Sequence, residues 1–365
     1  MTLKGKSLPN IIFPTVLYFI WRLLILLFQV FLQPYLVTLQ SQTIQQRIFT
    51  AWVKNWDSGH YLAISQSGYQ YPQQAFFPAW PLLIKLFSFD GLSGQVNLFV
   101  LSFILGLSVF ILFYILAKRL IGPDNAKYAL ILFCAFPSTM FLIAGYTEGL
   151  YLSLAMLSYI LLEKKRFLLS GAMGGLASLT RVVGVGIAIS QLLLEKPVDK
   201  KIIYFVLSLS GMVLYMIYLQ ITYSDPFFFI KAQHYWCEAA LHCQITFPLK
   251  PITDYAELIL VGWVRPALST VFIDWTTTVV FLIMLIPVFK KLGRIYFLYS
   301  AFVLLSPLLS GSTTSMVRYV LAAFPVFFLF PLVIKPRLAL ILLVILMFIL
   351  QLRFIALFTA GFWVA

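Results

Sequence analysis

The stretch LLSGAMGGLASLTRVVGVGIAISQLLL (168–194) decides how this chain is threaded. It is apolar on both sides of a single charged residue, Arg181. Its length suits one long helix across a membrane, and equally two shorter helices that meet near the arginine. Whether it holds one helix or two decides the side of the membrane on which every later segment begins.

The rest of the chain is equally apolar. Of its 365 residues, 62% are hydrophobic and 10% are charged, and the mean hydropathy is +0.96, whereas soluble domains carry about 25% charged residues. Apolar runs that approach or exceed the roughly 20 residues needed to cross a bilayer recur from end to end. The composition excludes a soluble fold. The sequence predicts one all-α integral membrane domain over residues 1–365, a polytopic bundle of transmembrane helices.

The distribution of basic residues decides whether 168–194 forms one helix or two. With two helices, every basic cluster falls on the same side as Lys4 and Lys6, which the positive-inside rule makes cytoplasmic; with one helix the clusters divide between the two sides. We therefore predict about eleven spans, with a cytoplasmic N-terminus and an extracytoplasmic C-terminus. The clusters are Lys118-Arg119-Lys127, Lys164-Lys165-Arg166, Lys196-Lys200-Lys201, Lys290-Lys291-Arg294 and Lys335-Arg337. The predicted spans are 11–33, 95–117, 126–142, 146–162, 168–180, 182–194, 201–222, 268–289, 295–310, 318–334 and 338–360.

This topology leaves two long loops outside, at about 34–94 and 223–267. The net charge of +14 is explained by loops beside a lipid bilayer, so no nucleic-acid partner is expected. Cys237 and Cys243 both lie in the second loop. Two nearby cysteines alone do not decide between a disulfide and free thiols, and both stay open.

The first loop combines aromatic and polar residues in a way that suits sugar binding. It contains Trp56-Asp57-Ser58-Gly59-His60-Tyr61, in which Asp57 and His60 are three residues apart and would share a helix face. They are candidates for a base or sugar-binding pair, with Trp56 and Tyr61 beside them. Solvated loop side chains are the alternative for both. Residues 76–87 are too short to span and have two prolines near their start, which predicts an interfacial helix; a packing element that closes the loop is the alternative.

Charged candidates also stand at the outer boundary of later spans. Glu148 would lie in the first turn of a span, where capping and catalysis are both open. Arg181 and Arg318 would face the same side and could offer planar donors to a phosphate, or they could snorkel to lipid headgroups. The remaining substrate-binding candidates are Tyr146, Tyr319, His234 and Trp236. For His234 and Trp236, which lie in the second long loop, a plain surface loop is the alternative.

Nucleotide and metal motifs are missing from the sequence. It contains no GxxxxGK[ST] phosphate loop and no GxGxxG after a strand, and His60, His234 and His242 lack the spacing of a metal motif. We expect that no cofactor or metal is required, while a divalent cation bridging Asp57 and Glu148 to a phosphate stays open. A sugar donor activated by a lipid phosphate could reach this site through the membrane.

Five motifs occur in order along the chain. They are Trp56-Asp57 to Tyr61 with Gly68-Tyr69, Phe76-Phe77-Pro78 to Pro81, Pro137 with Tyr146-Thr147-Glu148, Ala177 to Arg181, and Arg318-Tyr319 with Phe324-Pro325. In these motifs the chain resembles the PIG-V class of mannosyltransferases, within the GT-C glycosyltransferases that use polyprenyl-phosphate-linked sugars. The resemblance implies a GT-C-like fold, a lipid-phosphate donor of mannose, an inverting reaction, and Asp57 as the catalytic carboxylate of the first external loop.

Together these features predict a membrane glycosyltransferase, with mannose as the sugar. It would move the sugar from a polyprenyl-phosphate donor to a hydroxyl of a glycan or glycolipid on the extracytoplasmic or lumenal face. Asp57 would act as general base, Arg181 and Arg318 would bind the donor phosphate, and Glu148 would orient hydroxyls. The alternative class is a non-enzymatic transporter or flippase of lipid-linked sugars, in which the arginines grip a headgroup and no bond breaks.

Overall fold

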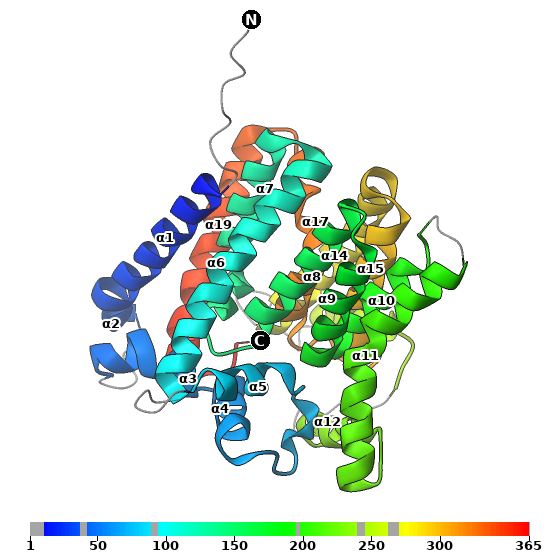
Figure 1. Cartoon of the computed structure of the whole chain (residues 1–365). Coiled ribbons are helices and arrows are strands. Elements are labelled where there is room, and N and C mark those ends of the chain that lie inside the picture. Colours follow the sequence, from blue (N-terminus) through cyan, green and yellow to red (C-terminus); the bar gives the residue numbers. More distant parts are fainter. Residues whose placement is uncertain are drawn as a thin grey trace, which may run out of the picture.

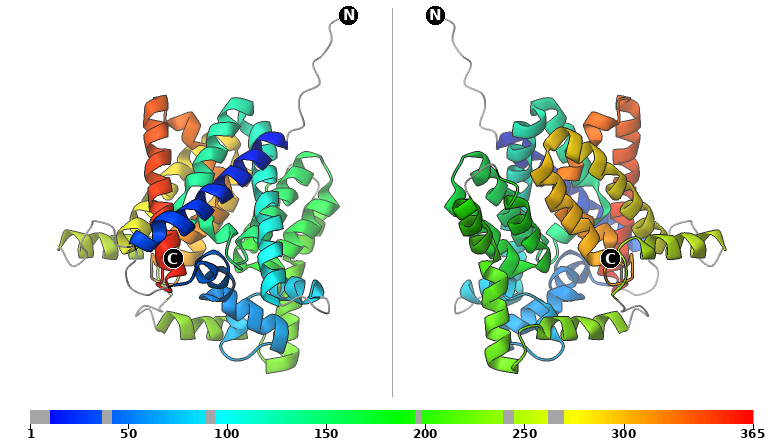
Figure 2. Two further views of the ribbon diagram at one scale, coloured as in Figure 1. Left: turned by 90° about the vertical axis from the view of Figure 1, so that its left-hand side faces the viewer. Right: turned by 90° about the vertical axis from the view of Figure 1, so that its right-hand side faces the viewer.

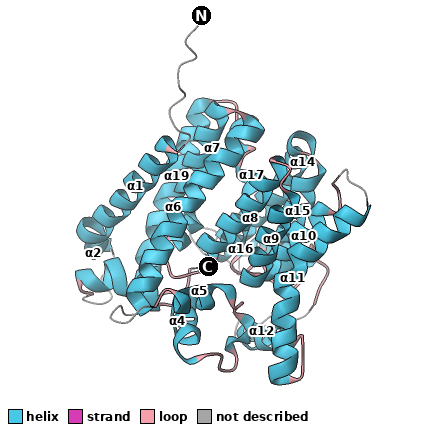
Figure 3. Cartoon of the chain, viewed as in Figure 1, coloured by secondary structure: helices cyan, strands magenta, loops and turns pink. Residues whose placement is uncertain are grey.

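Helices form all of the regular secondary structure in this computed structural model, which describes residues 11–36, 42–88, 94–194, 198–238, 245–261 and 270–364. No strand occurs in those ranges (Figure 3), so the all-α prediction is confirmed. The long helices are α1 (Ile12–Leu27), α6 (Gly94–Ile121), α11 (Val198–Tyr223), α14 (Thr270–Leu292) and α19 (Arg337–Thr359). The shorter ones are α2 (Gln33–Leu36), α3 (Ala51–Lys54), α4 (Asp57–Ser67), α5 (Ala79–Leu86), α7 (Pro123–Ala135), α8 (Glu148–Glu163), α9 (Phe167–Thr180), α10 (Val185–Gln191), α12 (Phe228–Glu238), α13 (Lys250–Leu260), α15 (Arg294–Leu308), α16 (Met316–Tyr319), α17 (Phe324–Phe327) and α18 (Phe330–Val333).

Several of these helices suit a membrane. Within the described ranges, five are long and apolar enough to cross one: Ile12–Tyr35, Gly94–Ile121, Lys200–Tyr223, Thr270–Leu292 and Arg337–Thr359. The number rises to six if the bent pair Met316–Ala322 and Phe324–Val333 forms one span. The predicted count of eleven stays a prediction, because the other predicted spans correspond to shorter or interrupted helices.

Two of the predicted spans are interrupted close to a proline. The span predicted at 126–142 is wrong in its second half, because α7 ends at Ala135 and a separate 3-10 turn runs from Pro137 to Leu142. Phe136 is extended (φ −63°, ψ 138°), the conformation favoured before a proline. The span predicted at 318–334 is bent by 85° after Ala322, and the new short helix α17 begins at Phe324 with Pro325 in its first turn.

The segment 168–194 forms two helices that run antiparallel. α9 ends at Thr180, Arg181 is extended (φ −154°, ψ 145°), and α10 leads back along α9. The Gln191 side-chain amide lies 3.3 Å from the Ser170 hydroxyl, near the other end of the pair. At the turn, a Cβ on Gly184 would stand 2.6 Å from the Ala177 carbonyl oxygen, so the close return needs glycine. The prediction of two helices meeting near Arg181 is confirmed.

The first long loop covers one end of the bundle. Figures 1 and 2 show α4, α5 and α12 gathered there, at the bottom of each view. The Asn55 amide donates to the Phe358 carbonyl near the end of α19, and the Gln74 amide donates to the Tyr223 hydroxyl at the end of α11, both at 2.9 Å. The short helix predicted at 76–87 is α5, which begins later than predicted, after Pro78.

Basic residues occupy the opposite end. The Tyr296 hydroxyl, at the start of α15, donates to Glu163, at the end of α8, over 3.2 Å. This contact brings Lys164-Lys165-Arg166 near Arg294, while Arg337 begins α19 at the end far from Phe358. The basic clusters are thus separated from the first loop. Lys4, Lys6, Lys196, Cys243 and the side chain of Cys237 lie outside the described residues, so the disulfide stays a prediction.

Candidate active site

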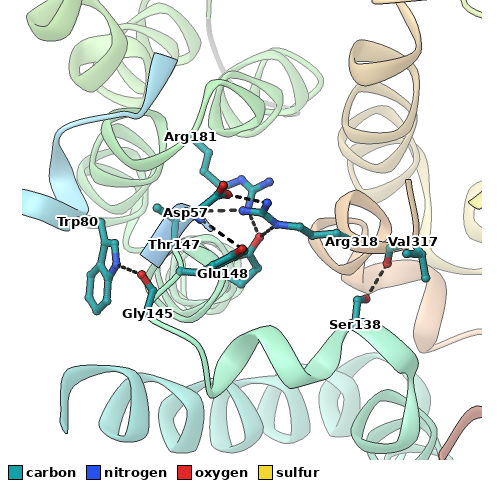
Figure 4. A network of polar contacts seen from close by, with 10 residues as sticks. Asp57, Trp80, Ser138, Gly145, Thr147, Glu148, Arg181, Val317 and Arg318 are labelled. Atoms are coloured by element: carbon teal, nitrogen blue, oxygen red, sulfur yellow. Dashed lines mark hydrogen bonds and ion pairs between the residues drawn. The ribbon is translucent and has the colours of Figure 1, made fainter. Parts of the chain in front are cut away.

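Four charged side chains from four separate segments meet where the first loop contacts the helix bundle (Figure 4). The Arg318 guanidinium binds two acids at once: its Nη1 lies 2.7 Å from Oδ2 of Asp57, and its Nε lies 2.6 Å from Oε1 of Glu148. Arg181 forms an ion pair with the same Glu148 oxygen and lies 3.3 Å from the Thr147 hydroxyl. The structure thus brings together all four charged candidates predicted from the sequence.

Burial makes the pairing of these charges necessary. The side chains of Glu148 and Arg318 are 3% and 7% exposed, and those of Arg181 and Asp57 are 13% and 17% exposed. A buried charge without a partner costs several kcal/mol. Two guanidinium and two carboxylate groups sum to zero, so the cluster can exist away from water. Asp57 is the most exposed member and is the best placed to meet a substrate.

Glu148 carries an additional feature, an oxygen without a partner. Both arginines bind its Oε1, whereas Oε2 is buried and accepts no hydrogen bond within the described residues. Buried polar atoms are normally paired. A hydroxyl donor from a ligand would satisfy this oxygen.

A strained backbone presents Asp57. Trp56 has φ 53° and ψ −130°, a left-handed region that costs a bulky residue about 1–3 kcal/mol. Directly after it, Asp57 begins α4, and the Ser58 hydroxyl fixes this turn by donating to the Trp52 carbonyl at 2.9 Å. The Trp56 ring meets Trp363 edge-on at 5.2 Å. Strain of this kind gathers at functional sites because it aims a side chain.

A tyrosine ring packs against each of the two arginines. The Arg318 guanidinium carbon lies 4.4 Å from the centre of the Tyr146 ring, which itself stacks on Phe141 at 4.9 Å. Arg181 lies 5.8 Å from the Tyr319 ring. A cation over an aromatic face is attracted to it. Tyr146 and Tyr319, predicted as substrate-binding residues, therefore contact the arginines in this structure.

The two long loops meet in an aromatic cluster one helical turn from Asp57. His60 stacks on Phe76 at 5.1 Å, Trp236 meets His60 edge-on at 5.0 Å, and Tyr61 meets Phe76 edge-on at 5.1 Å. Burial lowers the pKa of His60, an effect that the nearby Asp57 carboxylate opposes. The net lowering keeps His60 neutral at neutral pH. His234 lies exposed on α12, two residues before Trp236.

Sequence reasoning missed one buried acid near the site. Asp274 on α14 is 3% exposed and accepts backbone hydrogen bonds from Ser315 and Val317, directly before Arg318. An acidic residue inside an apolar span is a signal of function that could have revealed it. Within the described ranges, no group of three or more His, Cys, Asp and Glu residues is placed to hold a metal ion.

Comparison with known proteins identifies the family. The model of the family described as Mannosyltransferase (PIG-V) matches residues 13–249. The chain belongs to this family. Asp57, Glu148 and Arg181 lie inside the matched residues of this PIG-V family member. Arg318 lies beyond them, and the structure alone joins it to the other three.

Curated relatives are similar over part of their length. The chain is 32% identical over 145 residues to GPI alpha-1,6-mannosyltransferase 2 of Cricetulus griseus, covering 36% of this chain and 29% of that protein. It is 28% identical over 153 residues to GPI mannosyltransferase 2 of Schizosaccharomyces pombe, covering 40% and 32% of the two chains. The matched part thus spans about a third of these relatives.

A solved structure has a similar fold. The oligosaccharyltransferase of Archaeoglobus fulgidus, in a complex with zinc and sulfate, superposes with a TM-score of 0.51 over 93% of this PIG-V family chain and 53% of its own. The sequences are 14% identical, so the likeness concerns the fold alone. It confirms the predicted GT-C-like architecture.

The charge balance of the cluster predicts a large stability difference between two acids. Glu148→Gln should lower the free energy of unfolding by about 3–5 kcal/mol, because it leaves two buried arginines with one carboxylate. Asp124→Asn breaks an exposed pair with Lys127, whose side chains are 85% and 47% exposed, and should cost less than about 1 kcal/mol. Thermal unfolding in detergent would compare them. Equal losses would contradict the balanced-charge account.

Proposed function

We propose that this PIG-V family member is a membrane mannosyltransferase that uses a polyprenyl-phosphate-linked sugar as donor. One observation carries the proposal: Arg318 joins the most exposed acid, Asp57, to Glu148 beside a second arginine. Paired arginines suit a phosphate, and a partly exposed carboxylate suits an acceptor hydroxyl. The family and the names of the relatives support mannose as the sugar. A glycan or glycolipid would supply the hydroxyl.

In the proposed reaction, the acceptor hydroxyl gives its proton to Asp57 while its oxygen attacks the anomeric carbon. The bond between that carbon and the phosphate oxygen breaks, and its electron pair leaves with polyprenyl phosphate. Attack from the face opposite the phosphate inverts the anomeric centre. General-base help of this kind contributes roughly 10²- to 10⁴-fold to the rate.

The proposed step conserves the charge of the site. Asp57 becomes neutral as it takes the proton, while the phosphate gains one negative charge as its sugar leaves. Arg181 and Arg318 would stabilise that developing charge, a contribution of about 3–4 kcal/mol for one lost donor. Glu148 holds both guanidinium groups through one oxygen, so they are oriented before the donor arrives. Its unpartnered Oε2 would accept a hydrogen bond from a sugar hydroxyl.

The aromatic cluster extends the proposed site outward. His60 and Trp236 meet edge-on next to Phe76, and the neutral imidazole can both donate and accept hydrogen bonds. We propose that this cluster, with Trp56 and His234 on the same end of the molecule, contacts sugar or acceptor groups. If this role is right, Trp236→Ala should raise the KM for the acceptor. An unchanged KM would contradict it.

Asp57→Asn should abolish sugar transfer, with a loss of about 10²-fold or more, because the amide cannot take the acceptor proton. The assay uses purified protein in detergent, radiolabelled polyprenyl-phosphate mannose and an acceptor extract. Donor binding should survive, since both arginines remain. Asp225→Asn is the matched control, because Asp225, between α11 and α12, pairs with Lys231 on α12 and should leave transfer unchanged.

The same assay separates transfer from transport. If the natural chain binds the donor and never consumes it, the enzyme proposal fails and a non-enzymatic carrier of lipid-linked sugars takes its place. Full activity in Asp57→Asn would remove Asp57 as the base.

We also propose that the reaction requires no metal ion. Arg318 already places a positive group between the carboxylates of Asp57 and Glu148, where a bridging cation would otherwise sit. Excess EDTA should therefore leave the transfer rate within about two-fold of its starting value, because the guanidinium groups supply the charge. A loss of activity that Mg²⁺ or Mn²⁺ restores would show that a bridging cation takes part.

We propose that the site faces the extracytoplasmic or lumenal side, because the basic clusters lie at the other end of the molecule. In a variant with serine at positions 237 and 243, Ser67→Cys should react with an impermeant maleimide in intact cells or sealed vesicles of known orientation. Asp124→Cys should react only after permeabilisation. Both positions are exposed, so access to water does not differ between them. The reverse pattern would invert the proposed topology.

A further inference from the structure

Arg318 is carried by a very short helix. α16 spans only Met316–Tyr319, and the segment bends again after Ala322. Ser315, just before the helix, has φ 65°, a left-handed conformation that is unfavourable for a residue with a side chain. A single helical turn has little stability of its own. The position of the guanidinium therefore depends on what holds this turn.

Asp274 holds the turn from α14. Its Oδ1 accepts the backbone N–H of Val317 at 2.7 Å, and its Oδ2 accepts the backbone N–H of Ser315 at 3.1 Å. From the other side, the Ser138 hydroxyl donates to the Val317 carbonyl at 2.6 Å, as Figure 4 shows. Both backbone groups of Val317, the residue before Arg318, are thus bound to side chains from other segments.

The chemistry of Asp274 fits this task better than ordinary packing does. A buried carboxylate is costly unless hydrogen bonds compensate for lost water. Here the compensation comes from two amide groups at the beginning of a helix, where negative charge is favoured. Both carboxylate oxygens are used, each on a different amide. An asparagine of the same shape could accept only one of these two bonds.

We propose that Asp274 is a positioning residue. It fixes the position of the Arg318 guanidinium relative to Asp57, Glu148 and the donor phosphate. This inference rests on the proposed function, since it assigns Arg318 to the phosphate. Arg318 bonds both acids over 2.6–2.7 Å, so a small shift of its backbone breaks at least one contact. A misplacement of about 1 Å near a reacting centre can cost about 10²-fold in rate.

The test is a double-mutant cycle between Asp274→Asn and Arg318→Lys. In the natural background, Asp274→Asn should lower kcat about 10- to 100-fold while the KM for the donor changes less, because the developing charge on the phosphate loses its partner. In the Arg318→Lys background, the same change should cost less than about three-fold. Thr278→Val is the matched control, since the Thr278 hydroxyl bonds the carbonyl of Asp274 on α14 and, in the part of the chain that the structure describes, forms no hydrogen bond to α16.

Two further measurements keep the test decisive. Ser138→Ala disturbs the same turn more gently and should show the same dependence on Arg318, which covers the case in which Asp274→Asn does not fold. The thermal midpoints of the four proteins in the cycle should also be non-additive, because the loosened turn weakens the Arg318–Glu148 contact. This readout needs no turnover, so it remains informative if the natural chain transfers no sugar and the proposed function fails. Additive effects on both kcat and thermal midpoint would overturn the role of Asp274.

Discussion

The double ion pair of Arg318 is the interaction on which the rest of the site depends. Its guanidinium binds Asp57 and Glu148 together, and Glu148 in turn binds Arg181. A low-dielectric setting penalises any unbalanced charge, so the completed cluster needs all four side chains. Their segments are far apart in the chain, and the cluster therefore constrains how the first loop, α8, the α9–α10 turn and α16 pack against one another.

All four charged residues stand where a helix begins, ends or breaks. Asp57 and Glu148 are the first residues of α4 and α8, Arg181 is the extended residue after α9, and Arg318 lies on a one-turn helix beside a bend. Side chains in the middle of a long helix would face lipid or other helices. The interruptions thus let charged groups from four separate segments converge on one point.

The sequence was informative wherever the signal is local. Apolar run length predicted the all-helical membrane fold, and the distribution of basic residues predicted the break at Arg181, which the antiparallel contact of Gln191 with Ser170 confirms. Charged and aromatic residues at span boundaries identified the side chains that meet in the cluster. The bend after Ala322 and the early end of α7 were missed, because the apolar pattern continues through both. Asp274 could have been noticed as an acid inside an apolar span, but its contacts could not be predicted, because its partners are the backbone amides of Ser315 and Val317.

The ion pairs of the cluster can form only in the order in which their residues are synthesised. Glu148 and Arg318 are 170 residues apart, whereas Glu148 and Arg181 are separated by only 33. At about 5–20 residues per second, the ribosome needs roughly 10–30 seconds to advance from Glu148 to Arg318. During that interval Glu148 can be neutralised by Arg181 alone, and Asp57 has no cation from α16. The cluster of Asp57, Glu148, Arg181 and Arg318 can therefore be completed only after Arg318 has been synthesised, late in the chain.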